Sequence, residues 1–186
     1  MHKIRKKIVA ISGSTRSNST NESLLKVIAN LYSEKLDVQI YNGIAELPHF
    51  NPDLDNETAP LNVVTFRDLI EKADGVIICT PEYVFSLPGS LKNAIEWTVS
   101  TTVFLEKPVA LIVASGLGEK TYESLTLIMN TVGAKIGEDA RLLIQGTRRK
   151  LNGQGQLTDE NTLQSIHKLM NSFMETIKDA LTSNTK

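Results

Sequence analysis

The chain has 186 residues, of which 41% are hydrophobic. This is enough to bury one sheet beneath covering helices and too little for two independent cores, so we expect a single domain over residues 1–186. Twenty basic and 21 acidic residues leave a net charge of −1, which favours neither nucleic acid nor an acidic membrane surface as a partner. No apolar run approaches the roughly 20 residues that span a bilayer, so we expect a cytoplasmic protein.

Short β-rich runs alternate with longer segments of helical period along the chain. This order predicts an α/β protein in which right-handed βαβ crossovers build a parallel sheet. The third and fourth runs are apolar without alternation, which is typical of central strands covered on both faces. The five expected strands are residues 7–12, 37–41, 75–80, 108–114 and 139–144.

The expected helices lie between these strands and after the last one. The first begins near Ser19, which precedes Glu22 by three residues as in a capping box, and it continues to about residue 35. Prolines and asparagines in residues 42–60 predict a long connection after the second strand. Four further segments with a helical stripe of apolar residues begin near Leu61, Ser90, Lys120 and Thr158.

Ligands of an open parallel sheet bind beyond the carboxyl ends of its strands, so the loops found there carry the functional prediction. The loop after the first strand leads directly into a helix, and backbone N–H groups, hydroxyls and a guanidinium there predict an anion site. Its single glycine argues against both the dinucleotide fingerprint and the P-loop, which favours a monophosphate. The alternative is a flexible turn capped by Ser19. The candidate ligands are Ser14, Arg16, Ser19, Thr20 and Asn21.

The loop after the third strand covers residues 80–90 and is stiffened by two prolines. A planar ligand could meet ordered backbone donors there, beside aromatic and apolar side chains. In the alternative interpretation, Tyr83, Phe85 and Leu87 plug the end of the sheet. No second carboxylate or histidine stands near Glu82, which favours a capping role over catalysis for this residue.

The remaining candidates give weaker signals. Ser115 and Gly116 follow the fourth strand, where glycines let main-chain amides approach a ligand, although an ordinary turn is the alternative. Cys79, the only cysteine, is predicted to be a packed thiol rather than a nucleophile, and the three scattered histidines give no metal site. A group of basic residues is interpreted as solvated surface rather than as contacts to a dinucleotide phosphate: Lys120, Arg141, Arg148, Arg149 and Lys150.

Two of these loops, with the helix that follows the second, resemble the NADPH-dependent FMN reductase family. The shared residues are Gly13-Ser14-Thr15-Arg16 with Ser19 and Asn21, Pro81-Glu82-Tyr83 with Ser86 and Gly89, and Leu91-Lys92-Asn93-Ala94-Ile95-Glu96-Trp97. With the connection at residues 47–53, the similarity extends from about residue 7 to residue 132. The resemblance implies a flavodoxin-like three-layer α/β/α sandwich, a five-stranded parallel sheet in the order 2-1-3-4-5, and a homodimer or homotetramer.

The resemblance also implies FMN as cofactor, NADPH or NADH as electron donor, and flavins, quinones, azo compounds or metal oxyanions as acceptors. Carried over by position, one group of residues would hold the FMN phosphate: Ser14, Arg16, Ser19, Thr20 and Asn21. A second group would line the isoalloxazine ring and its other edge: Pro81, Glu82, Tyr83 and Val84, with Ser115 and Gly116. Many members carry Asn where Val84 stands, so the contact here would come from the backbone.

These observations predict an NAD(P)H-dependent flavin oxidoreductase of ping-pong type. Hydride would pass from NAD(P)H to FMN and then to a small acceptor on the same face of the ring, with no side chain nominated as acid or base. The alternative is a flavodoxin-type electron carrier that acts on a protein partner, which the near-neutral charge disfavours. A third alternative binds a phosphorylated metabolite and no flavin.

Overall fold

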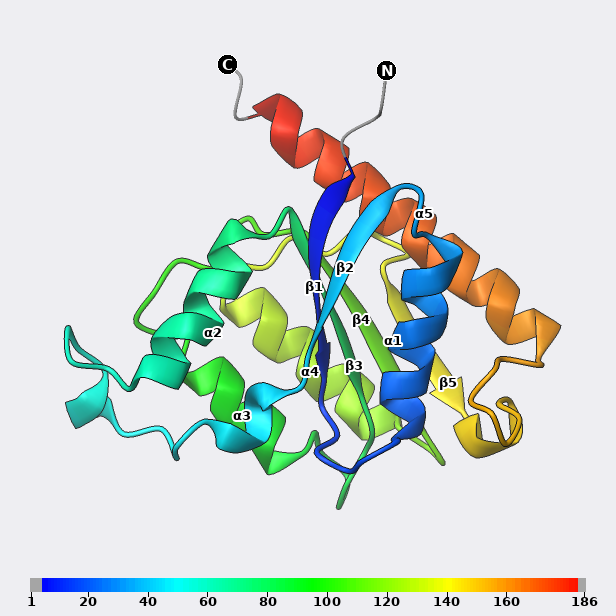
Figure 1. The fold of residues 1–186 in the computed structure, drawn as a ribbon, viewed down its shortest axis with the longest axis horizontal. Coiled ribbons are helices and arrows are strands. Elements are labelled where there is room, and N and C mark those ends of the chain that lie inside the picture. Colours follow the sequence, from blue (N-terminus) through cyan, green and yellow to red (C-terminus); the bar gives the residue numbers. More distant parts are fainter. Residues whose placement is uncertain (1–4, 184–186) are drawn as a thin grey trace.

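Five parallel strands form the centre of the computed structural model, which describes residues 5–183 (Figure 1). Their spatial order is β2-β1-β3-β4-β5, which confirms the predicted order. Each strand begins and ends within two residues of its expected bounds, because the apolar runs that predicted the strands are also the ones that the helices cover. The strands are β1 (Lys6–Ser12), β2 (Leu36–Tyr41), β3 (Gly75–Thr80), β4 (Val109–Ser115) and β5 (Arg141–Gln145).

Five helices occupy the expected segments, and short 3-10 turns lie in the connections. The helices are α1 (Thr20–Leu31), α2 (Leu61–Lys72), α3 (Gly89–Glu96), α4 (Glu119–Thr131) and α5 (Glu160–Ser183). The turns are η1 (Gly43–Glu46), η2 (Pro52–Leu54) and η3 (Thr147–Arg149). None of the helices in the described part of the chain is long and apolar enough to cross a membrane.

The end of α1 differs from the prediction. The helix stops four residues before the expected limit at residue 35, and Leu31 of the predicted apolar stripe is 47% exposed. The turn that follows the helix closes through bonds from the N–H groups of Lys35 and Leu36 to the carbonyl of Tyr32. This tight turn brings the chain directly into β2, so that a longer helix would displace the first residue of that strand.

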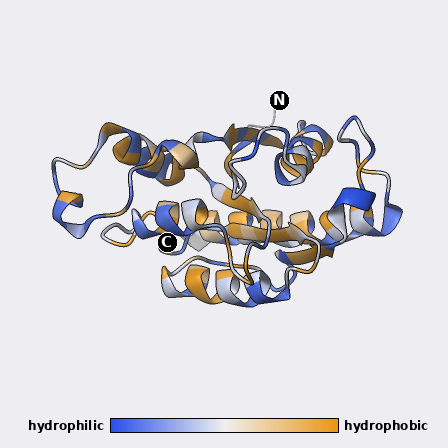
Figure 2. Ribbon diagram, turned by 90° about the horizontal axis from the view of Figure 1, so that it is seen from below, coloured by the Kyte–Doolittle hydropathy of each residue, from blue (hydrophilic) through white to orange (hydrophobic). Residues whose placement is uncertain are grey.

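Two hydrophobic layers hold the helices against the sheet. One face packs against α1 and α5 through side chains such as Leu25, Ile28 and Phe173, while the other packs against α2, α3 and α4. Figure 2 shows the mainly hydrophobic sheet between helices that alternate hydrophobic and hydrophilic residues. All six residues of β3 are buried, and removing a large side chain such as Ile78 would cost about 2–5 kcal/mol. The sheet is therefore a rigid base for its loops.

The long connection after β2 is fastened to α3. Both Trp97 Nε1 and Asn93 Nδ2 donate to the carbonyl of Pro48, at 2.7 and 2.9 Å, and the N–H of Phe50 donates to Asn93 Oδ1. These bonds fix the helix that follows the loop after β3. Because all strands run in the same direction, the loops that leave them meet at one edge, at the bottom of Figure 1.

Candidate functional site

A cleft of about 1540 Å³ opens at the carboxyl edge of the sheet. Its walls are the loops that follow β1, β3, β4 and β5, together with one side of α1. The structure brings ten of the eleven predicted site residues to this cleft: Ser14, Arg16, Ser19, Thr20, Asn21, Pro81, Glu82, Tyr83, Ser115 and Gly116. The exception is Val84, which does not line it.

The loop after β1 is pressed against β3. Gly13 continues the pairing through a 2.8 Å bond from its N–H to the carbonyl of Cys79. A Cβ at this position would lie 2.2 Å from Thr80 Oγ1, so only glycine permits the approach. Beyond it, the N–H of Arg16 donates to Ser14 Oγ at 3.3 Å, which folds the loop back toward the start of α1.

The start of α1 has the geometry expected of an anion site. Ser19 is the N-cap, as predicted, and its Oγ accepts from the N–H of Glu22 at 3.1 Å. The N–H groups of Thr20 and Asn21 have no intrahelical acceptor, because they belong to the first turn. The positive end of the helix dipole adds to their attraction for a negative group.

Arg16 adds a full positive charge to that end of the helix. Within residues 5–183, its guanidinium makes no ion pair and no side-chain hydrogen bond, and the side chain is exposed. A guanidinium presents planar donors that match a phosphate in a bidentate fashion. The protein therefore leaves this group free for a ligand.

Cys79 is a packed thiol, as predicted. It is fully buried in β3, and burial raises the pKa of the thiol well above its ordinary value. Its Sγ donates to Asn21 Oδ1 at 3.4 Å, which ties the first turn of α1 to the sheet. Cys79 is thus a packed side chain that holds the first turn of α1 in place.

Glu82 caps the N-terminus of α4. Its carboxylate accepts from the N–H of Gly118 at 3.1 Å and from the N–H of Thr121 at 2.9 Å. Burial raises the pKa of Glu82, but these bonds from Thr121 and Gly118 outweigh burial, so that its pKa lies below the usual value. The prediction of a capping role is confirmed. Glu82 joins the loops after β3 and β4 into one wall.

Two strained residues form the tip of the loop after β3. The N–H and carbonyl groups of Tyr83 and Ser86 bond to each other, at 2.9 and 3.0 Å, across Val84 and Phe85. Both central residues have positive φ, +51° and +57°, which is the signature of a type I′ turn that normally carries Asn-Gly. Val84 is 96% exposed, so its side chain points away from the cleft. Of the three aromatic or apolar residues of the alternative plug, only Leu87 is buried.

The loops after β4 and β5 are joined to each other. The N–H of Gly146 donates to the carbonyl of Gly116, and Thr147 Oγ1 donates to the carbonyl of Ser115, both at 3.3 Å. A Cβ on Gly116 would meet nothing within 4 Å. The fold does not require a glycine there, so the open space beside this backbone is available to a ligand.

The sequence interpretation missed two residues. Arg148 and Arg149 line the cleft, whereas Lys120 pairs with Glu123 and Lys150 with Asp159, and Arg141 lies outside it. The two arginines directly follow the carboxyl end of β5. Applying to the fifth strand the rule used for the first, third and fourth would have identified them.

The residues present fit a phosphorylated planar ligand. The helix terminus, the hydroxyls and the free guanidinium of Arg16 suit a phosphate, while Tyr83 and the open backbone at Gly116 suit a flat ring. Fold and cleft together define a flavodoxin-like α/β protein whose carboxyl edge suits a nucleotide.

Comparison with known proteins identifies the family. The model of the NADPH-dependent FMN reductase family matches residues 6–147. A related sequence is the NADH:(hydroxy)cinnamate reductase subunit CrdA of Vibrio ruber, which is 32% identical over 89% of this chain and 84% of the relative. Another is a quinone reductase of Escherichia coli K12, with 29% identity over 92% and 95%. The chain therefore belongs to the NADPH-dependent FMN reductase family.

Solved structures agree with this assignment. FerB, a flavoenzyme NAD(P)H:(acceptor) oxidoreductase from Paracoccus denitrificans, superimposes with a TM-score of 0.83 at 31% identity, covering 94% of this chain and 98% of FerB. An archaeal flavodoxin with 12% identity and a TM-score of 0.61, covering 91% and 98%, shares the fold. The predictions of a flavodoxin-like fold and of an NAD(P)H-dependent flavin oxidoreductase with FMN as cofactor are confirmed at the level of the family.

Proposed function

We propose that this chain reduces a small acceptor, such as a quinone or a free flavin, by a ping-pong reaction through FMN. FMN held in the cleft would take a hydride from NAD(P)H and deliver it to the acceptor. The protein supplies binding and orientation, and no side chain is proposed as acid or base. The name of the E. coli relative, a quinone reductase, supports a quinone as acceptor.

The observation that carries the proposal is the free guanidinium of Arg16 beside the N-terminus of α1. We assign the FMN phosphate to this point, held by Arg16, by first-turn N–H groups and by the hydroxyls of Ser14, Ser19 and Thr20, with Asn21 fixing the turn from below. A dianion here would face both a full positive charge and the positive end of the helix dipole.

The ring would lie between the loops after β3 and β4. Pro81 and Tyr83 would line one side of the isoalloxazine, with Ser115 and Gly116 at its other edge. Glu82 would contribute indirectly, because its carboxylate already holds α4. Val84 would contribute its backbone alone, since its side chain points into solvent.

The test is a visible spectrum of the purified protein, followed by NADPH or NADH under anaerobic conditions and then by a quinone. We expect a yellow protein that bleaches with the nicotinamide and recovers its colour with the quinone. Steady turnover without a second protein, with parallel lines in double-reciprocal plots, is expected of a ping-pong enzyme. A protein that stays colourless after FMN addition would refute the proposal, and turnover only with a protein partner would favour the electron carrier.

We extend the proposal to a single domain over residues 1–186 that acts in the cytoplasm, where NAD(P)H is available, and assembles as a homodimer or homotetramer. Large apolar side chains that stay exposed on or next to α3 and α4 support an interface: Val99, Leu105, Leu117 and Leu127. Sedimentation of the wild-type protein and of Leu127→Glu measures the oligomeric state. A monomeric wild-type protein would refute the proposed assembly.

A further inference from the structure

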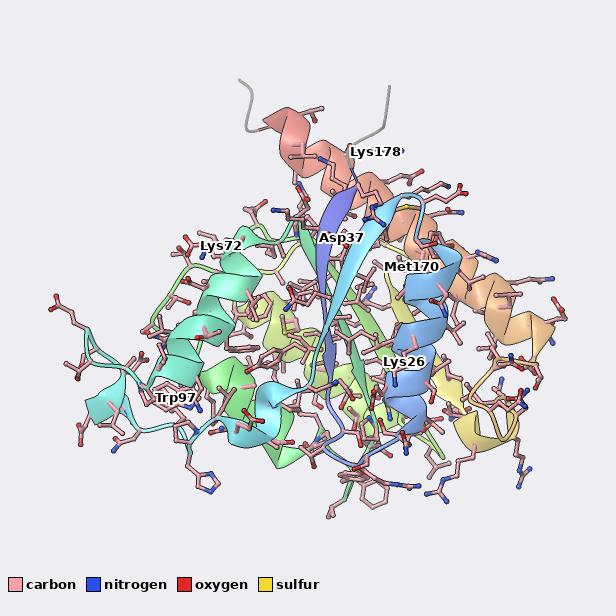
Figure 3. All side chains as sticks on the ribbon, viewed as in Figure 1. Lys26, Asp37, Lys72, Trp97, Met170 and Lys178 are labelled. Carbon is pink, nitrogen blue, oxygen red and sulfur yellow. The ribbon has the colours of Figure 1, made fainter. Side chains whose placement is uncertain are left out.

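The cleft is larger than an FMN site. Its volume of about 1540 Å³ exceeds the roughly 300–1,000 Å³ of ordinary small-ligand pockets. Besides the loops assigned to FMN, it is lined by Ser23, Lys26, Asn30 and Leu31 of α1. Leu31 lies eleven residues beyond Thr20, which is about 16 Å along the helix axis. The cleft therefore has a branch that leaves the phosphate site and runs along α1, past Lys26, which is labelled in Figure 3.

A closed hairpin forms the second wall of this branch. Leu151 pairs with Leu157, and Asn152 Oδ1 accepts from the N–H groups of Gln154 and Gln156, at 3.0 and 2.9 Å. The hairpin touches α1, since a Cβ on Gly155 would lie 3.1 Å from Ser23 Oγ. The branch is thus bounded by α1 on one side and by this hairpin on the other.

The cleft concentrates positive charge in a chain whose net charge is −1. Its charged lining residues are Arg16, Lys26, Arg148 and Arg149 against Glu82 alone. The Glu82 carboxylate is occupied by amides of α4, and Lys26 pairs with Glu22 at 2.7 Å. In residues 5–183, neither Arg148 nor Arg149 has an ion pair or a side-chain hydrogen bond. Two guanidinium groups therefore remain once Arg16 has taken the flavin phosphate.

We propose that this branch is a second anion subsite, which binds the phosphorylated adenosine half of a dinucleotide through Arg148 and Arg149. Guanidinium groups suit phosphate oxygens because they donate two parallel bonds. Asn30 and Gln154, whose side-chain amides have no partner among residues 5–183, supply donors and acceptors for an adenine edge. The inference rests on the proposed function, because the dinucleotide must also reach the flavin site.

Two dinucleotides carry this chemistry. The adenylate of a flavin adenine dinucleotide would continue directly from the phosphate at Arg16 into the branch. Alternatively, the adenosine end of NADPH, with its 2′-phosphate, would occupy the branch while the nicotinamide reaches the ring. The shared prediction is a subsite for an adenosine phosphate that does not depend on bound flavin.

Calorimetry with 5′-AMP and with 2′,5′-ADP tests the subsite directly. We compare the wild-type protein with the Arg148→Ala/Arg149→Ala double variant and with Arg141→Ala, an exposed arginine outside the cleft. One of the two nucleotides will bind the wild-type protein more tightly. The double variant should bind that nucleotide at least tenfold more weakly, as expected for the loss of one or more charge-assisted bonds. Arg141→Ala should bind it like the wild type. An Arg148→Lys/Arg149→Lys variant should give an intermediate affinity.

Binding of FAD and kinetics with NADPH identify which dinucleotide supplies the adenylate. If it is the flavin dinucleotide, the double variant loses about tenfold in FAD affinity and keeps its FMN affinity within about twofold. If it is NADPH, the double variant has a higher KM for NADPH relative to its KM for NADH, and its kcat is unchanged. Absence of adenylate binding by the wild-type protein at millimolar concentrations, or equal binding by the double variant, overturns the inference. Failure of the proposed function is separate, since it would appear as absent FMN binding in the wild type.

Discussion

Arg16 and Glu82 line the same cleft, and their charges have different partners. The Glu82 carboxylate accepts two amide hydrogen bonds from the start of α4, so its charge is stabilised by partners within the protein. The Arg16 guanidinium has no partner in the described part of the chain, although it lies beside a helix terminus that attracts anions. A charge with internal partners stabilises the structure, whereas one without them is available to a ligand.

Of the variants suggested by this difference between Arg16 and Glu82, we expect the largest effect, a loss of FMN affinity, at Arg16. Arg16→Ala should raise the Kd for FMN by about 10- to 100-fold, because a hydrogen bond to a charged group contributes about 1.5–3 kcal/mol. The free energy of unfolding should change by less than about 0.5 kcal/mol, since no ion pair or side-chain hydrogen bond among residues 5–183 is lost. Flavin-fluorescence titration and urea denaturation measure the two quantities. Arg141→Ala is the matched control, and an unchanged FMN affinity in Arg16→Ala would remove the assignment.

Glu82 should show the opposite behaviour. Glu82→Gln replaces one acceptor oxygen by a donor that faces the N–H of Gly118 or Thr121, so we expect a loss of about 2 kcal/mol in unfolding free energy. Glu123→Gln in the same helix is the control, because its pair with Lys120 is exposed to solvent and contributes little to stability. Equal stability of the two variants in urea would show that Glu82 does not hold α4.

The pH dependence of the unfolding free energy tests the same role of Glu82. The pKa of Glu82 is lower in the folded protein than its usual value of 4.5, so its stabilisation is complete above that value. It is lost as the pH falls through the folded pKa, because the protonated carboxyl no longer accepts both bonds. The difference in urea midpoint between wild type and Glu82→Gln should therefore be constant near neutral pH and shrink in acid. A difference that grows in acid would contradict the sign.

The smallest effect is expected at the turn tip. Val84 is a β-branched residue at a φ of +51° and is almost fully exposed, so that no packing offsets its strain. Val84→Asn should raise the free energy of unfolding by about 1 kcal/mol, because Asn adopts the left-handed region more readily. A loss of stability in Val84→Asn would mean that the turn is not strained.

Local sequence signals sufficed for the elements and for part of the site. The uninterrupted apolar runs of β3 and β4 required cover on both faces, and the Ser19 to Glu22 spacing located the start of α1. Arg16 could be nominated because all residues of the proposed anion site lie close together in sequence, between residues 14 and 21. Period, capping and turn composition act over a few residues, which is why the sequence alone reveals them.

The partners of these residues were decided by the tertiary structure. Glu82 meets amides 36 and 39 positions away, Gly146 meets Gly116, and Arg148 and Arg149 reach the same cleft as Arg16. Likewise the exposure of Leu31 and the outward direction of Val84 depend on where the next strand and the turn lie. Which charge is satisfied and which stays open depends on contacts between distant segments, and only the packing of the whole sheet fixes those.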